Sequence, residues 1–197
     1  MRLEWGSHAI FDIYRRSVFG QMKADIFRYC QIYAEGGFYI DITKAVWTKL
    51  SSFASHNSLG VISFDKNESG QMAQPEIADL FLHPETLVSQ WCFGFAPRNS
   101  LLRIAIERIV ELSPFFENRV FSSVRQAVFA LTGPGLFTWA TRDYFAKFGN
   151  QRIAQTERFF GEPGFLERLD PENFAFSSAE HYASQTNRNI LTSRSSS

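Results

Sequence analysis

The sequence predicts an α/β domain, because helical and extended hydrophobic patterns alternate along it. The clearest helical pattern covers residues 22–34, where apolar side chains recur every three or four residues and form one stripe. Gly36 and Gly37 follow and are expected to end this helix, because glycine readily adopts the left-handed backbone conformation found at helix ends. The aromatic and β-branched run at residues 38–42 then predicts a strand, so helix, glycine turn and strand follow one another directly.

The same signals predict the remaining elements. Strands are expected at residues 61–64, 91–96 and 153–160, and helices at residues 99–112, 122–131 and 136–148. Pro114 is expected to end the first of these helices, because proline has no N–H and its ring clashes with the preceding turn. Pro134 is expected near the first turn of the last helix, where a missing N–H is harmless. The polar segment at residues 67–74 is expected to be a loop.

A single domain is expected over residues 1–190. The chain of 197 residues has the length of one ordinary domain and carries no internal repeat or linker. The serine-rich end, residues 191–197, is expected to be a disordered tail. The two cysteines, Cys30 and Cys92, are too few for a disulfide framework or an ordinary zinc site, so both are expected to be buried thiols.

Charge and hydropathy limit the possible partners. Lys and Arg together number 20, as do Asp and Glu, so the formal net charge is +0. No long-range field would attract nucleic acid or an anionic membrane, and no nucleic-acid partner is expected. The sequence shows no signal peptide and no long apolar run, so we expect a cytoplasmic protein with at most peripheral membrane contact. Phe is frequent, at 21 residues, and supplies rings for a core and for a cleft.

Polar side chains gather on both sides of the predicted glycine turn. Asp25 and Arg28 are three residues apart and therefore share one face of the helix. Tyr39 and Asp41 are two residues apart and therefore share one side of the strand. These four side chains are expected to meet in one pocket at the carboxyl end of the strand, where open α/β sheets bind ligands. The spacing alone leaves simpler roles open, namely a surface ion pair, a core tyrosine and a capping aspartate.

The same segment resembles a known family. The family pattern is Asp-x-x-Arg, one or two helical turns, and Gly-Gly-x-Tyr-x-Asp-x-Asp, and it is matched here by Asp25, Arg28, Gly36, Gly37, Tyr39 and Asp41. It is similar to the sugar-binding region of the DXD-containing glycosyltransferases. That group includes family 32 enzymes such as the yeast initiating α-1,6-mannosyltransferase, the glucosylating clostridial toxins and bacterial capsule-sugar transferases. Weaker similarity extends to Thr132-Gly133-Pro134 and to Glu180-His181-Tyr182.

The resemblance implies a GT-A-like nucleotide-sugar-binding fold and a role for each matching residue. Asp41, the first Asp of the motif, would be the catalytic residue and would orient the metal shell. The residues of the donor-sugar site would be Asp25, Arg28, Gly36, Gly37 and Tyr39. The metal ligands would be Asp41, Thr43 and His181, and the cofactor would be Mn²⁺ or Mg²⁺, which suit oxygen-rich sites.

Thr43 departs from the family pattern, because it stands where the family has its second Asp. A hydroxyl brings no charge to a metal ion. Three outcomes are therefore open: Asp41 and His181 hold the ion together with waters, metal binding is weak, or the chain is a degenerate homologue. The family also has an N-terminal strand–helix unit, and few residues precede Lys23 here, so part of that unit is expected to be missing.

The resemblance implies a glycosyltransferase that moves a hexose from a nucleotide-sugar donor to an acceptor hydroxyl. The acceptor would be a glycan or another hydroxyl compound, as in glycan or polysaccharide synthesis. A divalent cation would assist, and the anomeric configuration would be retained. A second interpretation is a non-catalytic sugar or nucleotide-sugar binding protein derived from such an enzyme. A third is a structural α/β domain whose motif similarity is accidental.

Overall fold

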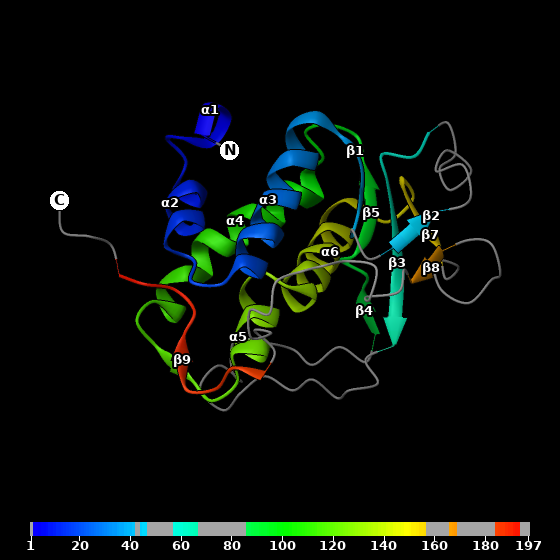
Figure 1. The fold of residues 1–197 in the computed structure, drawn as a ribbon. Helices are drawn as coiled ribbons and strands as arrows, with labels where there is room; N and C mark the ends of the chain where they lie inside the picture. Colours follow the sequence, from blue (N-terminus) through cyan, green and yellow to red (C-terminus); the bar gives the residue numbers. More distant parts are fainter. Residues whose placement is uncertain are drawn as a thin grey trace.

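The computed structural model describes residues 2–41, 44–46, 57–66, 86–156, 166–168 and 184–193. Within these ranges, a mixed β-sheet stands beside a group of helices (Figure 1), so the predicted α/β class is confirmed. The helices are α1 (Arg2–Trp5), α2 (Ala9–Arg16), α3 (Gly20–Glu35), α4 (Ser100–Phe116), α5 (Val124–Leu131) and α6 (Pro134–Phe148). The strands are β1 (Gly37–Ile40), β2 (Lys44–Val46), β3 (Gly60–Lys66), β4 (Thr86–Val88), β5 (Cys92–Phe95), β6 (Val120–Phe121), β7 (Ile153–Thr156), β8 (Leu166–Arg168) and β9 (Arg188–Asn189).

The central sheet has the strand order β1-β5-β3-β4, and β7 also pairs with β3. Its neighbouring strands run antiparallel, except for β3 and β7, which run parallel. β2 with β8 and β6 with β9 form two small antiparallel sheets that are not hydrogen-bonded to the central sheet through the described strands. The helices stand to one side of the central sheet in Figure 1, and α6 lies beside it.

A bulge interrupts the strand that pairs with β3. β4 and β5 pair with successive parts of β3, but the chain from Val88 to Gly94 is longer than the stretch of β3 that faces it. The N–H of Ser89 still donates to the carbonyl of Ser63 over 2.9 Å, so the bulge out of the ladder begins at Gln90 and includes Trp91. The bulge meets the end of β1, where the N–H of Asp41 donates to the carbonyl of Trp91 over 2.8 Å. The bulge thereby places Gln90 and Trp91 next to Asp41, at the end of β1.

Large rings fill the space between the sheet and the helices. Phe93 of β5 is fully buried, and its ring centroid lies 5.0 Å from that of Phe137 on α6 and 5.6 Å from that of Tyr39 on β1. Tyr39 therefore faces the helices, whereas Phe38 and Ile40 pack on the other face of the sheet. This alternation agrees with the one predicted for the strand.

The two cysteines are buried and unpaired, as expected. Burial raises the pKa of the Cys30 thiol and of the Cys92 thiol to about 12, so both stay protonated near neutral pH. They act as small hydrophobic side chains on α3 and β5.

Most of the predicted elements are present. α3, β1, β3, β5, α5 and α6 match their predicted ranges to within a few residues, and Pro134 begins α6 as expected. The strand predicted at residues 153–160 is described as far as Thr156, and the loop predicted at residues 67–74 lies outside the described residues. None of the described helices is long and apolar enough to cross a membrane.

Pro114 does not end its helix, contrary to the prediction. α4 continues through it to Phe116. Because Pro114 has no N–H, the carbonyl of Val110 loses its helical donor. The hydroxyl of Ser113 donates to that carbonyl instead, over 3.0 Å, and so replaces the missing hydrogen bond.

The expected tail boundary at residue 190 is also corrected. Leu191 is fully buried, and it bridges to Ser17 and to Glu117. The N–H of Thr192 donates to the carbonyl of Arg16 over 3.3 Å. An apolar residue just before the serine run packs into the core, so the ordered chain extends past the expected boundary; residues 194–197 lie outside the described part.

We expect the Phe93→Ala variant to lose about 3–5 kcal/mol of unfolding free energy, because it leaves a cavity at the centre of the aromatic cluster. Urea denaturation monitored by circular dichroism measures this loss. Phe115→Ala is the matched control, because Phe115 is 48% exposed and its removal should change stability by about 0.5 kcal/mol or less. Equal losses in the two variants would contradict the central role of Phe93.

Candidate functional site

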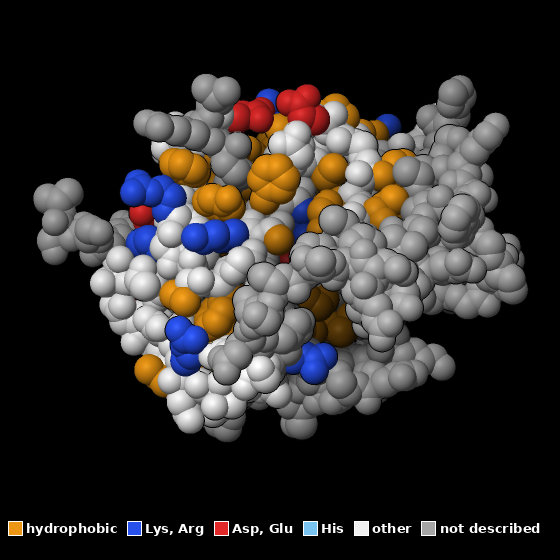
Figure 2. Space-filling model, viewed as in Figure 1, with side chains coloured by type: hydrophobic (Ala, Val, Ile, Leu, Met, Phe, Trp, Pro, Cys, Tyr) orange, Lys and Arg blue, Asp and Glu red, His pale blue; other side chains and the backbone are white. Residues whose placement is uncertain are grey.

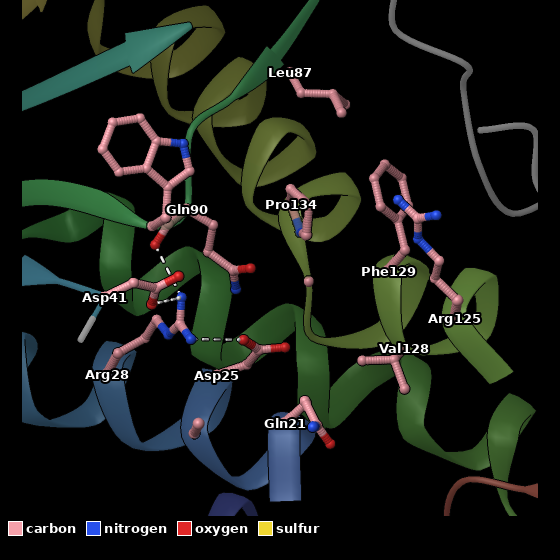
Figure 3. Close-up of a pocket in the computed structure, with 13 residues that line it drawn as sticks. Gln21, Asp25, Arg28, Asp41, Leu87, Gln90, Arg125, Val128, Phe129 and Pro134 are labelled. Atoms are coloured by element: carbon pink, nitrogen blue, oxygen red, sulfur yellow. Dashed lines mark hydrogen bonds and ion pairs between the residues drawn. The ribbon is translucent and has the colours of Figure 1, made fainter. Parts of the chain in front are cut away.

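A pocket of about 400 Å³ opens where α3, the end of β1, the bulge and the α5–α6 junction meet. Figure 3 shows its side chains, and Figure 2 shows the surface hollowed near the place where α5, α6 and β4 meet in Figure 1. Asp25, Arg28 and Asp41 form one wall, and Arg125 and Phe129 of α5 stand opposite them (Figure 3). The other lining residues are Gln21, Ala24, Leu87, Gln90, Trp91, Val128, Gly133 and Pro134.

Chain geometry brings Asp41 back to the level of Arg28. From Arg28 to Gly36 the helix advances about 12 Å, at about 1.5 Å per residue. From Gly37 to Asp41 the strand returns about 13 Å, at about 3.3 Å per residue. The two lengths match, so the spacing between the Asp-x-x-Arg segment and the Asp after the glycines places all three charges together.

The reversal between helix and strand takes place at two glycines. Gly36 caps α3 with φ 71°, and Gly37 follows with φ 98°. The N–H of Gly36 donates to the carbonyl of Ile32 over 2.8 Å. A Cβ at Gly36 would lie 2.7 Å from the ring of Pro97, so no side chain fits there.

Arg28 is the centre of the charged wall and is only 8% exposed. Its Nη2 lies 3.3 Å from Asp25 Oδ1, and its Nη1 lies 3.4 Å from Asp41 Oδ1. Nη1 also donates to the carbonyl of Gln90 over 3.0 Å, and the guanidinium lies over the ring of Tyr39, 4.3 Å from its centroid. Burial lowers the pKa of Arg28, but Asp25 and Asp41 more than offset this, so the pKa is raised and the cation is permanent.

Asp25 is 6% exposed and accepts a second contact on its other oxygen. The hydroxyl of Thr132 donates to Oδ2 over 2.9 Å. Loss of solvation raises the pKa of Asp25 to about 7, although Arg28 and the Thr132 hydroxyl lower it. The carboxyl therefore changes charge near neutral pH.

Asp41 is held by a hydrogen bond from Tyr39, a residue that packs against the core. The hydroxyl of Tyr39 donates to Asp41 Oδ1 over 2.6 Å. Burial raises the pKa of Tyr39 far above its usual range, so this hydroxyl stays protonated and remains a donor. The side chain of Asp41 is 33% exposed, and Oδ2 has no hydrogen-bond partner among the described residues. That oxygen is therefore available to a ligand.

The structure places the predicted donor-site residues at different positions. Asp25, Arg28 and Asp41 line the pocket, and Tyr39 contacts Arg28 and Asp41 from behind without being part of the lining. The two glycines lie at the opposite end of β1 from Asp41, away from the described lining. Their predicted role in sugar binding, like the catalytic role of Asp41, stays a prediction.

The predicted metal ligands are only partly described. Asp41 lies at the pocket with one free oxygen, whereas Thr43 and His181 lie outside the described residues. Within the described ranges, no group of three or more His, Cys, Asp or Glu side chains converges as a metal site would require. An accessible carboxylate oxygen suits Mn²⁺ or Mg²⁺, so Asp41 fits a cation that draws its remaining ligands from elsewhere.

The sequence did not predict a place for Gln90 at the site, and it gave Thr132 no specific role. The side-chain amide of Gln90 donates to the Tyr29 hydroxyl over 2.6 Å and to the Thr132 carbonyl over 2.8 Å. Gln90 was hidden because its place depends on the bulge, which only the pairing of distant strands reveals. Thr132 had one signal, its place in the Thr-Gly-Pro segment.

We expect the unfolding free energy to fall as the pH rises from about 4 to about 7. Asp25 titrates at about 7 when folded against an ordinary value of 3.8, so the folded state binds more protons in this window. The full fall from this group would be about 4 kcal/mol, since each pKa unit corresponds to about 1.4 kcal/mol. Urea denaturation across this pH range measures it, and Asp25→Asn should remove it; a variant that keeps the wild-type slope would contradict the assignment.

Comparison with known proteins agrees with a relation to sugar transfer. No protein-family model matches the chain. The chain is 26% identical over 146 residues to the Initiation-specific alpha-1,6-mannosyltransferase of Schizosaccharomyces pombe (strain 972 / ATCC 24843), an alignment that covers 69% of this chain. The chain spans about a third of that relative, 36% of its length. The solved PaToxG Glycosyltransferase aligns with a TM-score of 0.49 and 16% identity, over 75% of this chain and 44% of that one. The sequence similarity relates the chain to glycosyltransferases.

Proposed function

We propose that this chain forms the donor-sugar site of a GT-A-like glycosyltransferase, which transfers a hexose from a nucleotide sugar to an acceptor hydroxyl. The observation that carries the proposal is the meeting of Asp25, Arg28 and Asp41 in one pocket. These residues match the family pattern, and the similarity to a mannosyltransferase supports the same reading.

The pocket suits a sugar in size and chemistry. Its volume of about 400 Å³ falls within the range of roughly 300–1,000 Å³ typical of small-molecule sites. An ionised Asp25 would accept hydrogen bonds from sugar hydroxyls, and Arg28 would donate to sugar oxygens. Trp91 and Phe129 supply apolar surface for the C–H faces of the ring.

The proposed reaction breaks the bond between the anomeric carbon and the diphosphate, whose oxygen keeps the electron pair. A bond forms between the same carbon and the acceptor oxygen, and the acceptor proton passes to the leaving diphosphate. Retention would follow if the acceptor enters on the face that the diphosphate leaves. Asp41, with Thr43 and His181, would hold a Mn²⁺ or Mg²⁺ ion, which when bound would neutralise charge on the diphosphate.

A second function is supported by Thr43. With a hydroxyl where the family has a carboxylate, the metal site loses one negative charge. The chain would then bind a nucleotide sugar without turning it over. Donor binding without hydrolysis or transfer identifies this second function.

We expect manganese-dependent hydrolysis of UDP-glucose or GDP-mannose, and a rate lower by at least about a hundredfold in Asp41→Ala, because positioned charge at the leaving group is lost. Nucleotide release in a coupled assay measures the rate, and a thermal-shift panel of both donors with and without manganese reports binding. Asp12→Ala is the matched control, because Asp12 lies on α2 with a side chain 43% exposed. A donor that is hydrolysed equally fast by wild type and Asp41→Ala would refute the role of Asp41.

We expect Thr43→Asp to bind Mn²⁺ at least about tenfold more tightly than wild type, because a carboxylate restores the missing charge. Isothermal titration calorimetry with manganese alone measures the affinity. Thr43→Asn is the control, since it adds a comparable side chain without charge. Unchanged manganese affinity in Thr43→Asp would show that this side chain does not face the ion.

A further inference from the structure

Three residues that line the pocket form a closed ring of contacts with one residue behind it: Asp25, Arg28 and Gln90, with Thr132. The Thr132 hydroxyl donates to Asp25 Oδ2 over 2.9 Å, and Asp25 Oδ1 lies 3.3 Å from Arg28. Arg28 donates to the Gln90 carbonyl over 3.0 Å, and the Gln90 side chain donates to the Thr132 carbonyl over 2.8 Å. All four are buried, and Thr132 is fully so.

We propose that Thr132 is a positioning residue that holds the carboxylate of Asp25 in the orientation in which it accepts hydrogen bonds from the donor sugar. The sugar-binding part rests on the proposed function, whereas the positioning part concerns this chain alone. Thr132 does not itself line the pocket, so it would act through Asp25.

The backbone of Thr132 is held on several sides. Its N–H donates to the Val128 carbonyl over 3.0 Å, at the end of α5. Its carbonyl accepts from Gln90 and, over 3.0 Å, from the hydroxyl of Tyr29. A hydroxyl on such a fixed backbone is a directional donor, and this geometry is what suits Thr132 to orient a carboxylate.

The hydroxyl proton has two possible acceptors, and the distances favour Asp25. Thr132 Oγ1 lies 2.9 Å from Asp25 Oδ2 but 3.4 Å from the Val128 carbonyl. A bond to an ionised carboxylate is also the stronger type. With both Asp25 oxygens held, by Thr132 and by Arg28, the carboxylate has one preferred orientation.

The hydroxyl should also favour the ionised form of Asp25, which is the form that accepts sugar hydroxyl protons. Among the described residues, the charged or titratable groups near Asp25 are Arg28 and Tyr29 on α3, Tyr39 on β1, Asp41 after it, and Arg125 across the pocket. All of them remain when Thr132 is changed, so a change in the titration of Asp25 reports the hydroxyl.

The first experiment needs no ligand. The carboxyl ¹³C signal of Asp25 is followed against pH in wild type, Thr132→Val and Thr132→Ser. We expect Thr132→Val to move the midpoint upward by about one pH unit, as a lost charge-assisted hydrogen bond would. Thr132→Ser should restore the wild-type midpoint, because it keeps the hydroxyl. Thr141→Val is the matched control, since Thr141 is a buried threonine whose hydroxyl donates to the Phe137 carbonyl within α6.

The second experiment measures UDP-glucose and GDP-mannose binding against pH in the same variants. At pH 7 the ionised fraction of Asp25 would fall from about a half to about a tenth, so binding by Thr132→Val should weaken about fivefold. The loss should disappear near pH 9, which a merely structural defect would not do. If Thr132→Val does not fold, Thr132→Ala provides the same comparison.

The outcomes separate the two claims. An Asp25 midpoint unchanged in a folded Thr132→Val variant overturns the positioning role. A shifted midpoint that Thr132→Ser restores supports it. If wild type binds neither donor, the proposed function and the sugar-binding part of the inference fail, while the ligand-free titration still decides whether Thr132 positions Asp25.

Discussion

The buried guanidinium of Arg28 is the constraint on which the site depends. A cation taken out of water destabilises a fold unless charges and acceptors surround it. Here the compensation comes from Asp25 on the same helix, from Asp41 after β1, and from the backbone of Gln90 in the bulge. Because these partners belong to different segments, the charge of Arg28 ties α3, the edge of the sheet and the bulge to one arrangement. The aromatic cluster around Phe93 helps to position Asp41, because Tyr39 packs on Phe93 and its hydroxyl donates to Asp41.

The two carboxylates of the pocket differ in environment. Asp25 is buried and shared between a cation and a hydroxyl, whereas Asp41 keeps one oxygen toward the open pocket. The first is suited to a neutral polyol, because a neutral ligand leaves the buried charge balance intact. The second is suited to a cation, because it is accessible to solvent and brings charge that Arg28 only partly cancels. The two carboxylates would therefore divide the donor that we propose between them, with the sugar at Asp25 and the metal-bound diphosphate at Asp41.

The local part of this site was predictable from the sequence, and the long-range part was not. The helix, the glycine turn and the strand each have local signals, and their lengths bring Asp25, Arg28 and Asp41 together. Gln90 lies in the bulge between β4 and β5, which pair with β3 in different registers. No local sequence pattern predicts such a change of register. Pro114 was misjudged because a neighbouring hydroxyl compensated for it, and Leu191 because its partners are far away in the sequence. The roles of Thr43 and His181 stay predictions, since both lie outside the described residues.

The glycine at the end of α3 has a consequence for the pocket at the other end of β1. Gly36 stands in a left-handed conformation against Pro97 and against the Phe95 carbonyl at the start of the β1–β5 pairing. A methyl group there would push β1 away from β5, and the displacement would be carried along the strand to Asp41. The position of Asp41 thus depends also on a contact outside the pocket, so a substitution that touches no substrate would still misplace this carboxylate.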